Sequence, residues 1–384
     1  MSPGTADVVV IGGGVVGAST AYHLAAAGVE HVVLLERADA VATGSTGACA
    51  GGFRHQFSSR INIELSLASV PMILGFAQEH GLPLDVVQDG YLFLVRTERE
   101  WAEFRTGAEL QRSLGVDAQL LTPEEAAAIA PGIAVDDVVG ATFCSDDGIA
   151  DPAGLTQGYA TLAREAGADL RFGVEVVAIE ADDAAVTAVR TGDGAISTPV
   201  VVNAAGPWAG TLAATVGVHL PLEPIPRMVV TTGPFPGAPA RRTLVIDAAT
   251  SYYFHKEGDG VLTGMGGRDE HASFSTEVDR RFIEEELLPT AVRVFPPIER
   301  AGVASMWAGL YEMTPDRHPI IGESPVRGLF LANGFSGHGF QHAPVVGKLL
   351  AELVVDGETR TVDISSLGFD RFERGDLVAE GRVV

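Results

Sequence analysis

The sequence predicts an α/β protein, α+β overall, in which a parallel-sheet domain is interrupted by a second, mainly antiparallel domain. The first 36 residues read as a strand, a glycine turn, a helix and a second strand. Further along, β-rich runs alternate with helical segments. The chain has 384 residues, which is long enough for two compact domains with their own cores.

The N-terminal unit is the most regular part of the pattern. Residues 7–11 form an apolar run typical of a buried strand, and 15–27 carry the small and apolar residues of a packed helix that ends at Gly28. Residues 31–35 read as the next strand. This order predicts a βαβ unit with two parallel strands.

The turn of that unit has the spacing of a dinucleotide site. Gly12, Gly14 and Gly17 form GxGxxG directly after the strand and at the head of the helix. The glycines let the backbone approach a pyrophosphate, and the helix N-terminus attracts it. Glu36 ends the second strand, where a carboxylate accepts hydrogen bonds from the ribose of an adenosine and disfavours a phosphorylated ribose. We therefore predict a Rossmann-like domain that binds an adenine dinucleotide, FAD or NAD.

The remaining segments are consistent with an insertion-split domain. The β-rich runs are 84–95, 138–143, 200–203, 228–232 and 244–246, and the helical ones are 98–114, 152–166 and 276–294. We expect one domain to comprise 1–84, 145–215 and 320–384, and the other to comprise 85–144 and 216–319. The stretch 233–240 is rich in proline and is expected to be a loop.

Charge and composition exclude several classes of function. The formal net charge of −24 repels nucleic acid and anionic lipid. Only Cys49 and Cys144 are cysteines, so neither a disulfide scaffold nor a metal site is indicated, although one Cys–Cys pair remains open. The apolar N-terminal run is short and lacks a basic leader, which argues against a signal peptide or a membrane span. We expect a cytoplasmic protein.

Two further glycine-containing segments are candidates for the same site. Residues 201–210, VVNAAGPWAG, read as an apolar strand that runs into a turn of small residues, which either closes on the dinucleotide or is a plain strand-to-helix turn. In the loop 334–341, Gly334, Gly337 and Gly339 would let the backbone approach a flat ligand, and a helix expected to start near Pro344 would direct its positive end at that ligand. The alternative is a glycine-rich turn without a ligand.

At this point the chain resembles the D-amino-acid oxidase superfamily, and within it the sarcosine oxidase, dimethylglycine dehydrogenase and proline dehydrogenase β-subunit group. The resemblance extends over nearly the whole chain. It depends on the N-terminal unit with Glu36 and on the motifs GSTGACAGGFRHQF (44–57), GIADPAGL (148–155), VVNAAGPWAG (201–210), GLYEMTPDRHPIIG (309–322) and NGFSGHGFQHAPVVGKLLAEL (333–353).

The resemblance implies FAD rather than NAD, and a Rossmann-like FAD-binding domain with a discontinuous, mainly antiparallel-sheet substrate domain. The loop 334–341 would pass beside the flavin, and Val176 would lie near the adenine. The residues expected to contact FAD are Gly12, Gly14, Val16, Gly17, Glu36, Arg37, Gly44, Ser45, Thr46, Val176, Ala205, Gly206, Trp208, Gly334, Gly337, His338, Gly339, Phe340 and Gln341.

The same resemblance implies candidates for the substrate site. Arg54 lies in the segment where sarcosine oxidases carry an arginine that grips the substrate carboxylate, and a guanidinium suits a bidentate carboxylate pair. Relatives often add a lysine where this chain has Gln341. His338 is expected to orient substrate or stabilise flavin charge, and Tyr311 and either Tyr253 or Tyr252 to supply pocket hydroxyls. For each of these residues, ordinary packing or a structural ion pair is the alternative.

Two departures from the relatives affect the predicted chemistry. Gly309 stands where monomeric sarcosine oxidases have the cysteine that bonds the flavin, and Ala48, followed by Cys49, stands where dimethylglycine dehydrogenases have the bonding histidine. We therefore expect noncovalent FAD. Thr263 stands where oxidases place a lysine that assists reduction of dioxygen, which favours a dehydrogenase with another electron acceptor.

The predicted function is FAD-dependent oxidation of the C–N bond of an amino acid, in particular a secondary or N-methyl amino acid. The substrate would pass a hydride to the flavin and leave as an imine that hydrolyses, and dioxygen or a redox partner would take up the electrons. A catalytic β-subunit of a hetero-oligomeric dehydrogenase, a non-catalytic FAD-binding assembly factor and an NAD-dependent dehydrogenase are the alternatives. The substrate and the oligomeric state are not predicted.

Overall fold

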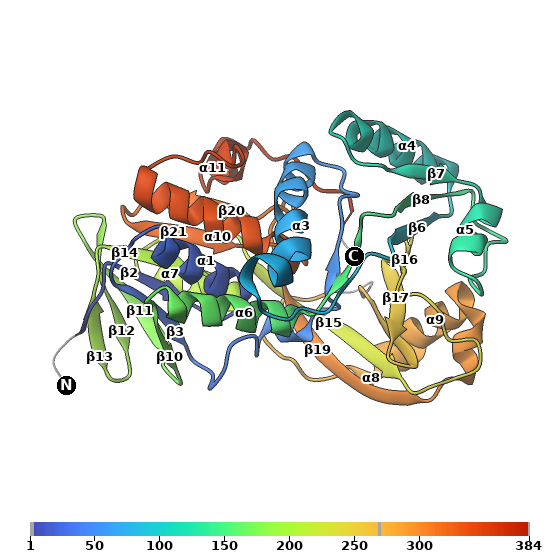
Figure 1. Ribbon diagram of the computed structural model, residues 1–384, viewed down its shortest axis with the longest axis horizontal. Coiled ribbons are helices and arrows are strands. Elements are labelled where there is room, and N and C mark those ends of the chain that lie inside the picture. The colour runs from blue at the N-terminus through green and yellow to red at the C-terminus, as the bar shows by residue number, and fades with distance from the viewer. Residues whose placement is uncertain (1–3, 268–269, 383–384) are drawn as a thin grey trace.

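A computed structural model of the chain describes residues 4–267 and 270–382, and its strands form four sheets. Figure 1 shows the two largest sheets side by side, with the Rossmann-like half on the left and the second half on the right. Helix α3 (Arg60–His80) lies between them. The α/β class and the discontinuous second sheet are confirmed.

The six-stranded sheet carries the N-terminal βαβ unit. Its order is β10 (Asp169–Phe172), β3 (Val32–Glu36), β2 (Val8–Ile11), β14 (Val200–Asn203), β21 (Leu329–Asn333) and β20 (Ile320–Glu323). All neighbours are parallel except β20 and β21. Both faces are covered, which explains why these strands are continuous apolar runs rather than alternating ones.

Alternate side chains of β2 face two different layers. Val8 and Val10 pack in a cluster with helices α1 (Val15–Ala26) and α10 (Gly339–Asp356). Val9 and Ile11 pack in another cluster with the four-stranded sheet. That sheet has the order β1 (Gly4–Thr5), β13 (Gly194–Ser197), β12 (Ala185–Thr191) and β11 (Val176–Asp182). The Rossmann-like half is therefore a three-layered unit.

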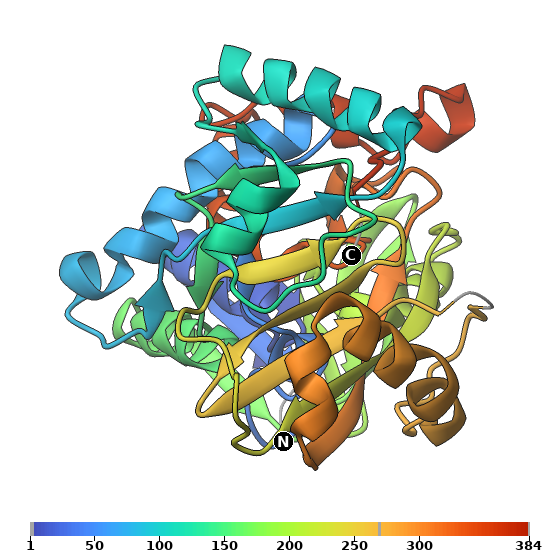
Figure 2. The same cartoon turned by 90° about the vertical axis from the view of Figure 1, so that its right-hand side faces the viewer.

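The eight-stranded sheet forms the core of the second half, and its strands fall within 85–144 and 216–319. Its order is β19 (Val303–Met313), β15 (Glu223–Thr232), β18 (Gly260–Met265), β17 (Tyr252–Glu257), β16 (Leu244–Asp247), β6 (Tyr91–Val95), β8 (Gly140–Cys144) and β7 (Gln119–Leu121). Only the β16–β6 pair is parallel. Figure 2 views this half with helix α4 (Glu98–Ser113) along the top.

Short elements join the two halves. A three-stranded sheet pairs β4 (Gly52–Phe53), β9 (Gly148–Ala150) and β5 (Val86–Val87).

The other helical segments are α2 (Ser45–Ala48), α5 (Pro123–Ile129), α6 (Pro152–Glu165), η1 (Gly206–Trp208), α7 (Ala209–Ala214), α8 (Arg280–Phe282), the π-helical turn η2 (Ile283–Leu287), α9 (Leu288–Val294), η3 (Pro296–Arg300), η4 (Ser365–Leu367) and α11 (Arg371–Arg374).

Helix α3 is long and apolar enough to cross a membrane by length and composition. Its face toward the protein, however, carries polar side chains with partners inside the chain. Ser69 Oγ donates to the carbonyl oxygen of Gln341 at 2.6 Å. Ser66 Oγ lies 3.1 Å from His342 Nε2 on α10. These bonds identify α3 as a helix that packs against the core.

Two predicted helix boundaries were wrong. The predicted helix 276–294 begins only at Arg280, because Asp279 serves as its N-cap and accepts a hydrogen bond from the amide of Phe282 at 3.0 Å. The helix expected near Pro344 begins five residues earlier, at Gly339, so Pro344 lies inside it. A proline in the second turn removes one amide donor, to Phe340 O, without ending the helix.

Candidate active site

A cavity of about 820 Å³ extends from the carboxyl ends of the parallel strands to the eight-stranded sheet. Gly12, Gly14 and Glu36 line it on the Rossmann-like side, and Tyr253 and Tyr311 line it on the other. Ligand sites of α/β sheets lie at this edge of the strands. One continuous cavity therefore joins the predicted nucleotide and substrate residues.

The glycine turn is closely packed against the backbone around it. Gly12 has a φ of +110°, and a Cβ there would lie 2.4 Å from the carbonyl oxygen of Ala204. A Cβ on Gly17 would lie 1.9 Å from the carbonyl oxygen of Gly12. Only glycine fits at either position without a backbone shift. This geometry is the close approach that a pyrophosphate site needs.

Glu36 and Arg37 lie at the nucleotide end of the cavity. The Glu36 carboxylate accepts hydrogen bonds from the amides of Gly13 at 2.6 Å and Ala38 at 2.8 Å. The Arg37 guanidinium carbon stacks 3.6 Å from the centre of a Trp208 ring. Glu36 is therefore held in a fixed position at the end of β3, as a ribose acceptor requires.

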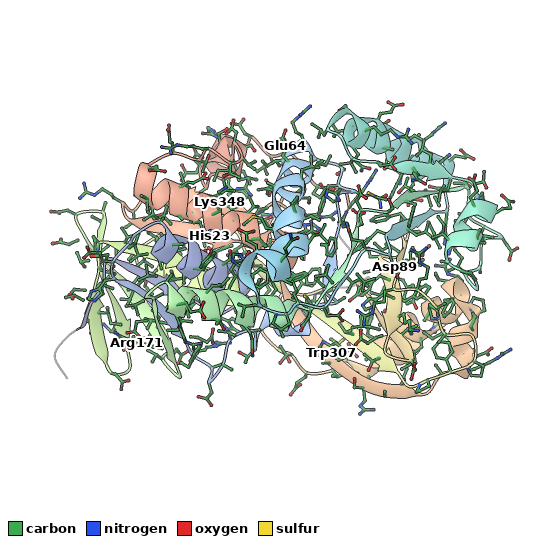
Figure 3. All side chains as sticks on the ribbon, viewed as in Figure 1. His23, Glu64, Asp89, Arg171, Trp307 and Lys348 are labelled. Carbon is green, nitrogen blue, oxygen red and sulfur yellow. The ribbon has the colours of Figure 1, made fainter. Side chains whose placement is uncertain are left out.

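The segment around α2 connects the two halves at the middle of the cavity. Thr46 Oγ1 accepts from the amide of Val15 at 3.2 Å, and Ser45 Oγ donates to the carbonyl oxygen of Leu310 at 2.7 Å. Trp307 on β19, labelled in Figure 3, donates from Nε1 to the carbonyl oxygen of Ala48 at 3.0 Å. These bonds fix α2 against the substrate-side sheet.

Most residues predicted to contact FAD line this cavity, and their roles stay predictions. Those that line it are Gly12, Gly14, Val16, Glu36, Arg37, Gly44, Ser45, Thr46, Val176, Ala205, Gly206, Trp208, Gly337, Gly339 and Phe340. Gly17, Gly334, His338 and Gln341 do not line it. Gly17 acts through the shape of the turn, as its contact with Gly12 indicates.

Two tyrosines form part of the substrate-side wall. Burial raises the pKa of Tyr253 well above its usual value, and burial also raises the pKa of Tyr311. Both phenols are therefore neutral at physiological pH and can donate a hydrogen bond. A Cβ on Gly337 would lie 2.4 Å from the Tyr311 ring, so this glycine lets the 334–338 loop pack against the ring.

Arg54 is buried, but it does not line the cavity. Its guanidinium donates to the carbonyl oxygen of Gln56 at 2.5 Å and to that of Arg382. It also stacks 3.9 Å from the centre of the Phe57 ring. These contacts favour a structural role, and the predicted carboxylate contact of Arg54 stays a prediction without support from its geometry.

His338 and Gln341 belong to the same buried network as Arg54. His338 Nε2 lies 3.3 Å from the Arg54 guanidinium, and burial followed by the Arg54 charge lowers the His338 pKa well below its usual value. Gln341 Oε1 accepts from the Arg54 amide at 3.1 Å, and its Nε2 donates to the Arg54 carbonyl oxygen at 3.1 Å. The amide of Gln341 thus ties α10 to the 54–57 segment, behind the cavity wall.

Three charged residues that were not predicted from the sequence line the cavity: Glu175, Arg227 and Glu312. Glu312 follows Tyr311 on β19; its Oε1 accepts from the amide of Phe335 at 3.4 Å, and burial raises its pKa to about 7. Arg227 comes from the middle of β15. The sequence offered one signal for Arg227: it is the single arginine in the largely apolar run EPIPRMVVTT. A charged residue that faces inward from such a run needs a partner, which marks it as a candidate for a functional site.

The positions at which the sequence departs from its relatives can also be placed in the structure. A Cβ on Gly309 would lie 2.8 Å from Cβ of Ala48, so the two positions of possible covalent attachment face each other. Cys49 lines the cavity, and burial raises the pKa of its thiol to about 11. Thr263 is buried and donates from Oγ1 to the carbonyl oxygen of Tyr253 at 2.8 Å. It lies outside the set of residues that line the cavity.

Comparison with known proteins supports the reading of this cavity. Residues 7–353 match the model of a family described as FAD dependent oxidoreductase. The chain is 33% identical to mitochondrial sarcosine dehydrogenase of Mus musculus over 96% of this chain and 42% of that protein. It is 32% identical to FAD-dependent oxidoreductase domain-containing protein 1 of Xenopus laevis, over 100% of this chain and 86% of that protein.

Among solved structures, L-proline dehydrogenase from P. horikoshii superposes with a TM-score of 0.90 at 34% identity, covering 98% of this chain and 100% of that chain. Glycine oxidase from Geobacillus kaustophilus superposes with a TM-score of 0.85 at 29% identity, covering 96% of this chain and 99% of that chain. The chain spans less than half of mouse sarcosine dehydrogenase, so that protein's whole activity does not transfer. With the family match over residues 7–353 and the dinucleotide geometry of the cavity, the chain belongs to the FAD-dependent oxidoreductases of the D-amino-acid oxidase type.

Proposed function

We propose that this protein oxidises the C–N bond of an amino acid, in particular a secondary or N-methyl amino acid, and that the product is an imine that hydrolyses. The observation that carries the proposal is the single cavity that joins the glycine turn to the tyrosine-lined sheet. FAD bound there supplies the hydride acceptor. Relatives named sarcosine dehydrogenase and L-proline dehydrogenase suggest the secondary amine.

The residues present fit FAD. The turn at Gly12 leaves no room for a side chain, and Glu36 offers a fixed carboxylate for the ribose of the adenosine. Arg37 and Trp208 close the nucleotide end, and Gly337 and Gly339 leave room beside the other end. The N-terminus of α10 begins at this second end and favours negative charge near it.

Three side chains of the substrate wall orient and shield the substrate rather than accept its proton, whereas the carboxyl of Glu312, with its pKa raised to about 7, titrates near neutral pH. Tyr253 and Tyr311 are neutral donors, and the protonated thiol of Cys49 is a weak nucleophile. An amine that arrives deprotonated needs no strong base, because its lone pair assists loss of the hydride. We therefore propose that the pH dependence of turnover reports the amine of the substrate together with the Glu312 carboxyl.

We also propose that FAD is held without a covalent bond. Gly309 and Ala48 have no atom that could form one, and the thiol of Cys49 is kept protonated by burial. Acid precipitation of the purified protein should release all yellow colour into the supernatant. Colour that stays in the pellet would contradict this proposal and point to Cys49.

For reoxidation of the flavin we propose an acceptor other than dioxygen. The hydroxyl of Thr263 donates its hydrogen bond to the Tyr253 carbonyl oxygen, and it carries no positive charge that could stabilise a developing superoxide. Reduced enzyme mixed with air-saturated buffer should reoxidise slowly, whereas an artificial acceptor dye should reoxidise it fast. Rapid reoxidation by dioxygen would instead assign an oxidase.

The main alternative is a subunit or assembly factor that holds FAD without turnover of its own. It is favoured by the partial coverage of mouse sarcosine dehydrogenase. Anaerobic titration of the FAD-loaded protein with sarcosine, proline, glycine and several D-amino acids separates the two. Bleaching of the flavin by at least one of them is expected, and no bleaching by any amine would contradict the stand-alone enzyme.

A further inference from the structure

Strand β15 separates the active cavity from a second one. Arg227 and Val229 line the active cavity, while Pro226 and Met228 line a second cavity of about 520 Å³. From Pro226 to Val229 neighbouring residues of the strand point to opposite faces, which explains this division, whereas Ile225, just before this stretch, also lines the second cavity. Arg227 is therefore directed at the same space as Tyr253 and Tyr311.

The guanidinium of Arg227 already holds a carboxylate. It forms an ion pair with Glu270, a residue that lines the second cavity. The Glu270 carboxylate also accepts from the amide of Gly267 at 2.8 Å. A Cβ on Gly266 would lie 3.1 Å from an atom of each partner, so this glycine leaves room for the pair. The site is thus shaped for one carboxylate between a guanidinium and a backbone amide.

The other cationic residue that lines the cavity does not compete for this role. This residue, Arg37, stacks on Trp208 at the nucleotide end. Arg227 lies beside the Tyr311 ring, with 5.0 Å from its guanidinium carbon to the ring centre. Its Nε is buried and has no hydrogen-bond partner among residues 4–267 and 270–382. One donor of this guanidinium is therefore left for a ligand.

We propose that Arg227 binds the carboxylate of the substrate and that Glu270 occupies this position until the substrate displaces it. The proposal rests on the amino-acid oxidation proposed above and adds the residue that selects for an acid group. Displacement gives the protein a selectivity filter, because an amine without a carboxylate cannot replace Glu270. Arg54, whose guanidinium is used by two backbone carbonyls, then has a structural role.

The test measures carboxylate binding to the FAD-loaded protein without turnover. Acetate, propionate and benzoate are titrated against the corresponding amides, and Kd is read from the change of the flavin absorbance spectrum. Wild-type protein should bind at least one acid and not its amide. Arg227→Gln should weaken that binding by about 30-fold or more, the size expected for loss of a charge-assisted bidentate pair. Arg241→Gln, at an exposed arginine paired with Asp89, is the matched control and should bind as wild type.

Glu270→Gln provides the second variant. Removal of the competing carboxylate should tighten the binding of the same acid by about three- to tenfold, because a neutral amide is displaced more easily than a paired charge. Arg227→Lys should retain part of the affinity, since it keeps the charge but not the bidentate geometry. Thermal unfolding of each variant, with and without the acid, reports folding and gives a readout that does not depend on the flavin spectrum.

Several outcomes would overturn the proposal. They are wild-type protein that binds no acid, Arg227→Gln protein that is folded and binds the acid as well as wild type, and Glu270→Gln protein that binds it more weakly. Loss of acid binding in folded Arg54→Gln protein, with Arg227→Gln unaffected, would assign the anchor to Arg54 instead. If acids bind through Arg227 but no amine bleaches the flavin, the proposed function fails and the carboxylate site remains.

Discussion

The two ends of the active cavity are built in different ways. At the nucleotide end, the turn of the N-terminal βαβ unit and the end of its second strand supply the closest backbone approach, and Trp208 closes this end from a later segment. At the substrate end, side chains from β15, β17 and β19 meet across the eight-stranded sheet. The first end depends on local backbone geometry, and the second depends on which face of a strand each side chain occupies.

The two buried arginines make this difference concrete. Arg54 was selected by a motif, but its guanidinium donates to the carbonyl oxygens of Gln56 and Arg382. Arg227 has no motif around it, yet it lines the cavity. A motif places the backbone of a residue, whereas the direction of a long side chain depends on partners that are distant in the sequence. Glu380, for example, lies near Arg54 only through folding, and its charge favours the charged form of that guanidinium.

The largest effect is expected at the nucleotide end. Gly17→Ala would place a Cβ 1.9 Å from the Gly12 carbonyl oxygen, so the turn must shift and FAD binding should be lost. The flavin content of purified protein measures this. Gly75→Ala, at a helical glycine of α3 with no atom within 4 Å of the added Cβ, is the control and should retain FAD. Equal flavin content in the two variants would show that the turn tolerates a side chain.

Replacing each buried arginine by methionine should show which of the two stabilises the fold and which is available to bind a ligand. Arg54→Met leaves two buried carbonyl oxygens without their donor, and we expect it to lower the free energy of unfolding by about 3–5 kcal/mol. Arg227→Met should change it by less than about 2 kcal/mol, because the side chain lies at a cavity and its one carboxylate partner is partly exposed. Urea denaturation gives both values. A larger loss for Arg227→Met would reverse the assignment of structural and binding arginine.

Glu36→Gln tests the acceptor at the end of β3. The carboxylate holds the amides of Gly13 and Ala38, and an uncharged amide would hold them and a ribose less well. Hydrogen bonds to a charged group contribute about 1.5–3 kcal/mol, so we expect a 10- to 100-fold higher Kd for FAD. Reconstitution of apoprotein with FAD, followed by fluorescence, measures it. An unchanged Kd would mean that Glu36 only supports the turn.

The last prediction concerns Glu312 and pH. Burial raises the pKa of this carboxyl to about 7 in the folded protein, and the unfolded chain has its usual value of 4.5. The folded state therefore binds the proton more tightly, and the resulting stabilisation is complete below pH 4.5 and is lost as the pH rises through about 7. We expect protonation of Glu312 to contribute about 1–3 kcal/mol to the free energy of unfolding.

Glu312→Gln should flatten the fall of stability between pH 5 and 7.5 relative to wild type, as followed by thermal unfolding across that range. Buried histidines act in the opposite direction below their usual pKa, since burial and neighbouring charges hold the pKa of His342 at about 3. Only the difference between variant and wild type isolates Glu312. Parallel pH profiles of the two proteins would contradict the raised pKa.

The fold could be predicted because its signals are local or periodic. The strand, glycine turn and helix around Gly12 follow one another in the sequence, and the apolar runs of the parallel strands reflect burial on both faces. The start of α10 could not be predicted from Pro344, because a proline is tolerated within the first turns of a helix as well as at its first position. The substrate wall was predicted only in part: Tyr253 and Tyr311 line the cavity, whereas Arg227 and Glu312 were not selected.

The sequence by itself determined the dinucleotide turn, the α/β class and the family resemblance, since each depends on the order and spacing of residues close together in the chain. Only the tertiary structure decided which arginine faces the cavity. Arg227 on strand β15 lines the cavity together with the tyrosines. The guanidinium of Arg54 instead donates to the carbonyl oxygen of Arg382 and stacks on the ring of Phe57. The alternation of a strand places Arg227 on one face of the sheet, but which face meets the cavity depends on long-range packing, and the contacts of Arg54 depend on segments distant in the sequence.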